Sequence, residues 1–189
     1  MAEKNDYVNR ELSWIEFNYR VLSEARDKST PLFDRLKFLS ITASNLDEFY
    51  MVRVASLKDM VHAKYAKKDI AGLTAKEQLD KISEKTHQLV DLQYSTYNRS
   101  LLPALKQQGL QIICEHEELS EEDGAFVDQF FHEDVYPVLT PMAVDSSRPF
   151  PLIRNKSLNI AALVQKKDSE DEELEFAMVQ VPSVLPRIV

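Results

Sequence analysis

The sequence predicts an α+β protein in which an all-helical N-terminal unit precedes a smaller unit of mixed helix and strand. Up to Lys106 the apolar residues recur at helical spacing, whereas from Leu110 short apolar runs alternate with turn-forming segments. The charge changes at the same place, since residues 1–106 carry +2 and residues 107–189 carry −10. We therefore expect a helical-bundle domain at 1–106 and an α+β domain at 107–189.

The first helix is predicted within "ELSWIEFNYRVLSEARDKS". Ser13 and Glu16 have the spacing of a capping box, in which the side chain of each residue accepts a hydrogen bond from the backbone N–H of the other. If the helix starts at Ser13, one of its faces should be buried against the rest of the bundle. That face is formed by Trp14, Phe17, Val21 and Ala25.

Two further helix starts and one stop can be placed in the same unit. Thr30, followed by a proline suited to the first helical position, should cap a helix that buries a leucine stripe. Thr74 and Glu77 form a second capping box, which opens a long helix. Pro103 should kink or end that helix, and Gly109 is a plausible stop signal.

A polar interruption lies in the apolar stretch "SITASNLDEFYMVRVASL". Ser44 can cap a new helix there, with Asp47 as its acidic partner, so the stretch predicts a helix junction. Arg53 would then share the apolar face of the new helix, where it needs an ion pair or a route to water. The other members of that face are Leu46, Phe49, Tyr50, Leu57 and Met60.

The same interruption has a functional interpretation. A helix N-terminus presents free N–H groups and partial positive charge, which suit a phosphate or the electronegative edge of a ring. Asn45 adds an amide that can donate and accept at once. Local sequence alone leaves capping and ligand binding both open.

The second unit is predicted from four short segments. "LQIICE" should be a strand, with Cys114 as a small buried apolar residue, and Ser120 should cap a helix in "SEEDGAFVDQFFHEDVY". "LNIAALVQ" and "EFAMVQV" should form a hairpin whose turn is the acidic "KKDSEDEELE". Because little follows the last strand, we expect an incomplete sheet with an exposed edge, and hence a truncated chain.

Several classes of function are disfavoured. The net charge of −8 argues against nucleic-acid binding, and neither a signal peptide nor a transmembrane run of about 20 apolar residues is evident. We expect a cytoplasmic protein, with peripheral membrane association left open. The three glycines cannot build a phosphate-binding P-loop, and the histidines lack metal-ligand spacing. We therefore assign no metal ligand and no catalytic residue. None of the four histidines, His62, His87, His116 and His132, receives either role.

Three motifs carry a resemblance to a known family. "RELSWIEFNYRVLSEA", "PLFDRLKFLSITASNLDEFYMVRVASL" and "LTPMAVDSSRPFPLIRNKSLNIAALV" are similar, in order and spacing, to the N-terminal portion of bacterial polyphosphate kinase. The resemblance implies a helical domain followed by the beginning of a head domain. It also implies transfer of the terminal phosphate of ATP to inorganic polyphosphate, with ADP as the partner nucleotide of the reverse reaction. The phosphohistidine and the Mg²⁺ ligands of the family would lie outside this chain, so the chain alone should be inactive.

The resemblance also implies a site and partners. The second residue of "SNLDEF" corresponds to the nucleotide contact of the family, which here is Asn45. The head domain would contribute to homo-oligomer contacts. From the charge pattern, and not from the resemblance, we consider Arg53 and Lys58 as secondary anion contacts.

Other basic residues have less defined roles. Lys58 belongs to a cluster with Lys64, Lys67 and Lys68, which would either favour a helix C-terminus or guide an anionic chain. The loop residues Arg148, Arg154 and Lys156 remain unassigned. The alternative to an enzyme is a non-catalytic helical module that binds another protein or polyphosphate.

Overall fold

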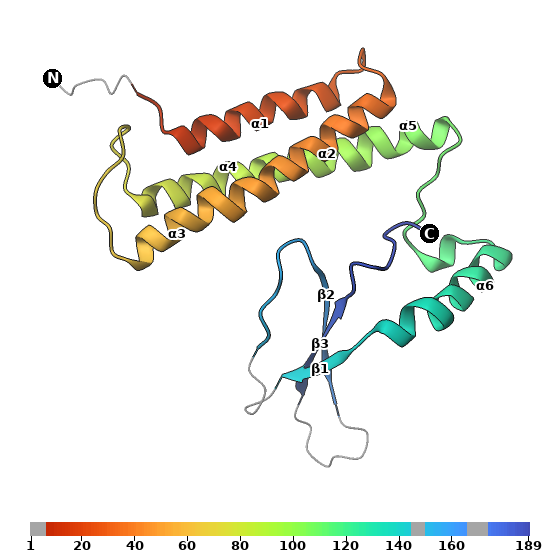
Figure 1. Ribbon diagram of the computed structural model, residues 1–189. Helices are drawn as coiled ribbons and strands as arrows, with labels where there is room; N and C mark the ends of the chain where they lie inside the picture. The colour runs from red at the N-terminus through yellow and green to blue at the C-terminus, as the bar shows by residue number, and fades with distance from the viewer. Residues whose placement is uncertain (1–6, 145–149, 166–173) are drawn as a thin grey trace. The chain divides into compact units, whose positions relative to one another are not determined.

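The computed structural model describes residues 7–144, 150–165 and 174–189, and it confirms the α+β class. The chain divides into two compact units, Met1–Ile112 and Ile113–Val189. Figure 1 shows helices alone in the first unit and strands together with helix in the second. The domain boundary expected after residue 106 stays a prediction.

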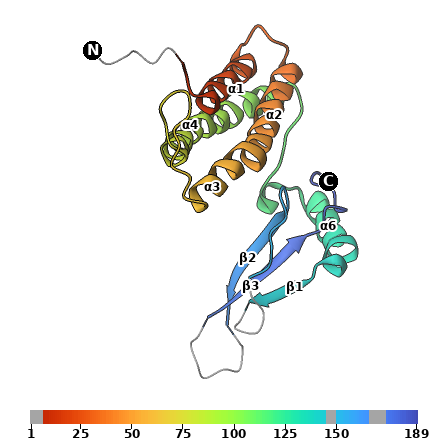
Figure 2. The same cartoon turned by 60° about the vertical axis from the view of Figure 1, so that its left-hand side comes forward.

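Three helical rods build the first unit, and they lie side by side in both views (Figures 1 and 2). The second and third rods each contain a short π-helical segment, η1 or η2, between two α-helices. Their bounds are α1 Arg10–Arg26; α2 Leu32–Phe49, η1 Tyr50–Val54 and α3 Ala55–His62; α4 Ala75–Thr96, η2 Tyr97–Leu101 and α5 Leu102–Gln107. α1 packs against both α2 and α4, and α3 packs against α4.

The capping box expected at the start of the first helix is wrong. α1 begins one turn earlier, because the side chain of Asn9 accepts a hydrogen bond from the Leu12 N–H at 2.9 Å. Ser13 therefore lies inside the helix, and the buried face is displaced from the expected one. Of the four expected residues only Ala25 is buried, and Phe17 is 46% exposed. The buried residues of α1 are Glu11, Ile15, Asn18, Leu22 and Ala25.

The expected starts of the second rod are also wrong. α2 begins at Leu32 after Pro31, with no side-chain cap from Thr30. It then continues through Ser44 to Phe49, so no helix junction exists there. The N–H groups around Ser44 belong to an unbroken helix, which leaves no free N-terminus for Ser44 to cap.

The π-helical segments explain why the expected buried face fails after Phe49. Consecutive buried positions are Phe49 and Val54 in one rod and Thr96 and Leu101 in the other, a step of five residues instead of three or four. A π-turn inserts one residue and so rotates everything after it. Tyr50 and Met60, expected in the core, are 38% and 39% exposed, whereas Val54 is buried.

The third rod follows its sequence signals more closely. The capping box of Thr74 and Glu77 is confirmed, with each side chain bonded to the other residue's backbone N–H. Pro103 lies in the first turn of α5, and the chain remains helical to Gln107. Gly109, with φ +83°, ends the rod as expected.

The second unit contains α6 Glu121–Phe130, whose N-cap Ser120 is confirmed, and a three-stranded antiparallel sheet. The strands are β1 Pro141–Val144, β2 Leu158–Val164 and β3 Glu175–Val181, in the order β1-β3-β2. β2 and β3 confirm the expected strands, and they pair with Ala162 opposite Ala177. β1 was not expected. Shorter helical segments also occur, namely η3 His116–Glu118, η4 Phe131–Val135 and η5 Tyr136–Val138.

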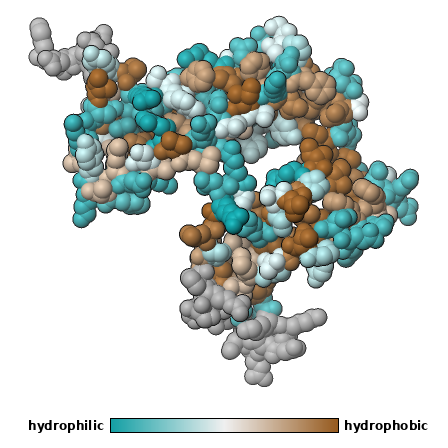
Figure 3. All heavy atoms as spheres, viewed as in Figure 1, coloured by the Kyte–Doolittle hydropathy of each residue, from teal (hydrophilic) through white to brown (hydrophobic). Residues whose placement is uncertain are grey.

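The strand expected at 110–115 is wrong, because this run has no regular secondary structure and no strand partner in the described part. Cys114 is accordingly exposed rather than buried. Apolar side chains reach the surface of both units (Figure 3), and Leu152 and Leu163 are examples in the second. Arg148 and most of the acidic turn lie outside the described residues. None of the described helices has the length and apolar character needed to cross a membrane.

Two helix ends share one motif but use different residues. At the end of α3, Lys64 lies in the left-handed region with φ 55°, and the N–H groups of Lys64 and Tyr65 reach back to the carbonyls of Val61 and Met60. At the end of α5, Gly109 has the same role. These are Schellman motifs, in which glycine avoids the steric cost of a side chain.

Lys64→Gly should therefore raise the free energy of unfolding by about 0.5–1 kcal/mol, because relief of a left-handed strain of about 1–2 kcal/mol exceeds the entropy cost of glycine. Gly109→Ala should lower it by about 1 kcal/mol through that strain alone, since no atom lies within 4 Å of the added Cβ. Urea unfolding followed by circular dichroism measures both changes. Lys67→Gly is the control, because Lys67 does not have positive φ, and an equal gain there would contradict the explanation.

Candidate functional site

A pocket of about 300 Å³ lies between α1 and the rod formed by α2 and η1. α1 contributes residues from its first two turns, and the other rod contributes residues on both sides of the transition to π-helix. The lining residues are Arg10, Glu11, Trp14, Phe17, Asn45, Glu48, Phe49, Val52 and Arg53. Two of the residues selected from the sequence, Asn45 and Arg53, therefore lie in one pocket.

One wall of the pocket is aromatic. The rings of Trp14 and Phe49 are stacked, with centroids 4.4 Å apart and planes 5° from parallel. Phe49 is only 3% exposed and belongs to the core, whereas Trp14 is partly exposed. The stack joins α1 to α2 and provides a rigid apolar surface beside the polar groups of the pocket.

Asn45 is held in place by a buried amide from α1. Its Nδ2 donates to Oδ1 of Asn18 at 3.1 Å, and Nδ2 of Asn18 donates to the carbonyl oxygen of Thr42 at 3.1 Å. Asn18 is fully buried, so its orientation is fixed by these partners. Within the described part of the chain, Oδ1 of Asn45 accepts no hydrogen bond, which leaves an acceptor and one N–H for a ligand.

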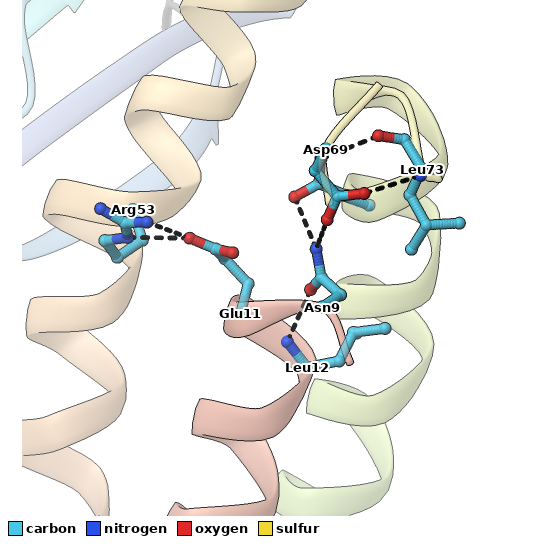
Figure 4. A network of polar contacts seen from close by, with 7 residues as sticks. Asn9, Glu11, Leu12, Arg53, Asp69 and Leu73 are labelled. Atoms are coloured by element: carbon cyan, nitrogen blue, oxygen red, sulfur yellow. Dashed lines mark hydrogen bonds and ion pairs between the residues drawn. The ribbon is translucent and has the colours of Figure 1, made fainter. Parts of the chain in front are cut away.

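Arg53 pairs with Glu11 across the pocket (Figure 4). Nε of Arg53 donates to Oε1 of Glu11 at 2.9 Å, and Nη2 donates to the same oxygen. The Glu11 side chain is 8% exposed and lies in the first turn of α1, where the helix dipole favours a negative charge. The Arg53 side chain is 44% exposed, so the ion pair is open to solvent on the arginine side.

The charges of the pocket nearly cancel. Its lining contains two arginines, Arg10 and Arg53, and two glutamates, Glu11 and Glu48. A balanced set of charges provides little net attraction for a polyanion. The combination of a flat aromatic wall, a free amide edge and no net charge instead suits an uncharged heteroaromatic ring.

The start of α1, which carries the pocket residues, is anchored by a polar network (Figure 4). Nδ2 of Asn9 donates to Asp69 at 2.6 Å and to Gln78 at 2.9 Å, which ties α1 to the loop before α4 and to α4 itself. Asp69 also accepts hydrogen bonds from the N–H groups of Ala71 and Leu73. The network thus fixes the position of the N-terminus of α1, the helix that carries four of the residues lining the pocket.

The ionisation of Asp69 reflects these contacts. Burial alone would raise the pKa of Asp69, but hydrogen bonds from the Leu73 N–H, the Asn9 amide and the Ala71 N–H outweigh it and hold the pKa below its ordinary value of 3.8. The charged form of Asp69 is therefore the one that the folded state prefers.

The remaining candidates lie elsewhere. Lys58 is exposed on α3 and is not among the residues that line the pocket, and Lys64, Lys67 and Lys68 are exposed beyond that helix. The sequence had not selected Asn18, Trp14 or Phe49 as site residues. The four-residue spacing of Trp14 and Asn18 was the available signal, but the incorrect start of α1 obscured it.

The histidines have local contacts. A ring nitrogen of His87 lies 2.7 Å from the Ser83 carbonyl one turn earlier, and His116 pairs with Asp128 at 3.1 Å. His62 and His132 are exposed on the helices that carry them. Among the described residues, no three His, Cys, Asp or Glu side chains are grouped in a way that could hold a metal ion.

Two family models match the chain in succession. Residues 7–113 match the polyphosphate kinase N-terminal domain, and residues 122–189 match the polyphosphate kinase middle domain. The first match alone covers more than half of the chain, and it contains the whole pocket. The fold and these matches define a class of protein in which a helical domain is followed along the chain by an α+β domain.

The chain belongs to the polyphosphate kinase family. It is 55% identical over 183 residues to the polyphosphate kinase of Lactiplantibacillus plantarum and 50% identical over 186 residues to that of Bacillus anthracis, covering 97% of this chain in each case. The crystal structure of polyphosphate kinase from Porphyromonas gingivalis superposes with a TM-score of 0.81 at 34% identity and also covers 97% of this chain. The chain spans about a quarter of these relatives, 25% and 26% of the two sequences and 26% of the crystallised chain.

The Asp69 network should make stability depend on pH in the acidic range. Because the pKa of Asp69 is lower in the folded than in the unfolded state, its contribution is fully present above its ordinary value of 3.8 and is lost as the pH falls through the folded value. Asp69→Asn should lower the free energy of unfolding at neutral pH by about 1–3 kcal/mol, since hydrogen bonds to a charged group are lost. This deficit should shrink below pH 4.

Urea unfolding of both proteins across this pH range measures the difference. Asp80→Asn is the matched control, because Asp80 is an exposed carboxylate on α4. Asp27 and Glu77 also have pKa values lowered by hydrogen bonds, so the wild-type curve slopes in the same direction and only the difference between variants isolates Asp69. A pH-independent deficit would contradict the role of its charge.

Proposed function

We propose that the pocket between α1 and α2 binds the adenine ring of ATP or ADP in a polyphosphate kinase. The observation that carries the proposal is the free amide edge of Asn45 beside the stacked rings of Trp14 and Phe49. An asparagine amide can pair with the donor and acceptor atoms on one edge of adenine. The volume of about 300 Å³ is at the lower end of small-molecule sites.

The charge of the pocket supports a base site rather than a phosphate site. Arg53 already pairs with Glu11, so it has limited capacity for a phosphate group. The phosphates of a nucleotide bound here would extend toward residues outside the pocket. In this proposal Asn45 recognises the base, Arg53 keeps the pocket in shape, and Lys58 has no direct contact.

The reaction that this site would serve is reversible transfer of the terminal phosphate of ATP to inorganic polyphosphate. We propose that the phosphohistidine and the ligands of Mg²⁺ are residues outside this chain. Mg²⁺ would stabilise the negative charge of the transferring phosphoryl group. The described residues would supply nucleotide binding, and the second unit would supply contacts to further copies in a cytoplasmic oligomer. On this proposal the chain alone binds ATP but transfers no phosphate.

Trp14 is the single tryptophan of the chain and lines the pocket, so its fluorescence reports on ligand binding directly. Titration with ATP, and separately with adenosine, should change this signal. Asn45→Ala should weaken both affinities about tenfold, because one or two hydrogen bonds to the base are lost. In a full kinase that contains this chain, the same substitution should raise KM for ATP.

Asn98→Ala is the matched control, since it removes an exposed amide outside the pocket of the same unit. Circular dichroism must show that both variants keep their helices, because Asn45→Ala also removes the donor to Asn18. Equal affinities of wild type and Asn45→Ala for adenosine and ATP would refute the base site.

Asn18 should act as a positioning residue for Asn45. Asn18→Ala removes the acceptor that fixes the Asn45 amide, so it should weaken adenosine binding about threefold to tenfold although Asn18 is fully buried and touches no ligand. In the Asn45→Ala background the same change should weaken binding no further, which a general loss of structure would not produce. A double-mutant cycle of adenosine affinities tests this, and additive losses would contradict it.

A further inference from the structure

A second pocket lies at the opposite end of α1 and is unlike the first. It has a volume of about 240 Å³ and is lined by Arg26, Leu92, Ser95, Thr96, Arg99 and Ser100. Its lining contains two guanidinium groups and three hydroxyls but no carboxylate. Among the ion pairs of the described residues, none involves either arginine.

A third arginine lies behind this pocket. Arg35 is only 6% exposed, and its side chain donates to the carbonyl oxygen of Ala25 at 2.9 Å and to Oγ of Ser100 at 2.8 Å. Both partners are neutral. The exposed carboxylate of Asp27 is attracted to Arg35, but the hydrogen bonds that it accepts come from Ser29. A buried guanidinium whose hydrogen-bond partners are all neutral is costly, and an anion bound close to it would reduce that cost.

The hydroxyl groups of this pocket differ in whether they have a proton to donate to a ligand. Thr96 donates its proton to the carbonyl oxygen of Leu92 at 2.7 Å, so it has none to offer. Ser100 accepts from Arg35, which leaves its own proton free to point into the pocket. Arg99 and Ser100 both lie in the π-helical segment η2, a type of distortion often found at functional sites.

We propose that this second pocket binds a phosphate-bearing anion, with Arg26 and Arg99 as its charged ligands and Ser100 as a hydroxyl donor oriented by Arg35. Two guanidinium forks and a hydroxyl match the several oxygens of a phosphate group, whereas a carboxylate would occupy one fork. Trp14 and Arg26 are twelve residues apart on α1, roughly 18 Å at 1.5 Å per residue, so the two pockets are separate. This inference is independent of the adenine proposal, because it rests on other residues.

Titration calorimetry of the 189-residue chain with inorganic tripolyphosphate tests the proposal. The wild type should bind, and the double variant Arg26→Gln/Arg99→Gln should bind about tenfold more weakly or not at all, since two charged hydrogen-bond donors are lost. Both arginines are exposed, so the variant should keep its fold, which circular dichroism checks. Lys67→Gln/Lys68→Gln is the control with the same change in net charge on exposed residues, and it should retain wild-type affinity.

The proposal is overturned if the wild type does not bind tripolyphosphate, if the arginine variant retains wild-type affinity, or if the lysine control loses as much affinity as the arginine variant. A competition arm identifies the source of the anion. In the Asn45→Ala chain, displacement of tripolyphosphate by ATP but not by adenosine would assign the pocket to the phosphates of a nucleotide. Failure of ATP to displace it would assign the pocket to inorganic phosphate chains.

Discussion

The contact between α1 and α2 depends on one buried amide. Asn18 is fully buried, and its Nδ2 donates to the Thr42 carbonyl oxygen while its Oδ1 accepts from the Asn45 amide. A buried polar group that must be paired fixes the register of two helices more strictly than apolar contacts, which tolerate sliding. The stacked rings of Trp14 and Phe49 join the same two helices. The register of α1 against α2 therefore determines both the packing of the core and the geometry of the pocket.

The two π-helical segments impose a second constraint. Each shifts the buried stripe of its rod by one residue, so that Val54 and Leu101 enter the core instead of their neighbours. The same shift leaves Arg53 and Arg99 exposed beside the two pockets. In both rods the exposed arginine lies within the π-helical segment itself, where the helix has left its regular period.

Sequence patterns predicted the local structure where the signal is local. The box of Thr74 and Glu77, the cap at Ser120 and the stop at Gly109 all depend on residues a few positions apart, and all are confirmed. The start of α1 was wrong because Asn9 competes with Ser13 as a cap, and its advantage comes from partners some 60 residues away. No periodicity could reveal that advantage.

The sheet shows the same limit. β2 and β3 are adjacent along the chain and were predicted, whereas β1 has four residues and becomes a strand only through pairing with β3. The run at 110–115 has suitable residues but lacks such a partner in the described chain, and it stays unpaired.

For the first pocket the sequence supplied two of the residues, Asn45 and Arg53, but not their relation. Proximity to α1 turns Asn45 from an expected cap neighbour into an amide with a fixed orientation. Proximity to Glu11 turns Arg53 from an awkward core charge into half of an ion pair. These relations require tertiary structure, because the partners lie 27 and 42 residues away in the sequence.

The two ends of α1 differ in how their charges are compensated. Near its start, Glu11 lies opposite Arg53, and the pocket is electrically balanced. Near its end, Arg26 and Arg99 line a pocket without a carboxylate, and the buried Arg35 has only neutral hydrogen-bond partners. The cost of burying the Arg35 guanidinium is only partly offset when all of its hydrogen-bond partners are neutral. The uncompensated end is therefore better explained by an anion that arrives from outside, and the balanced end by an uncharged ring.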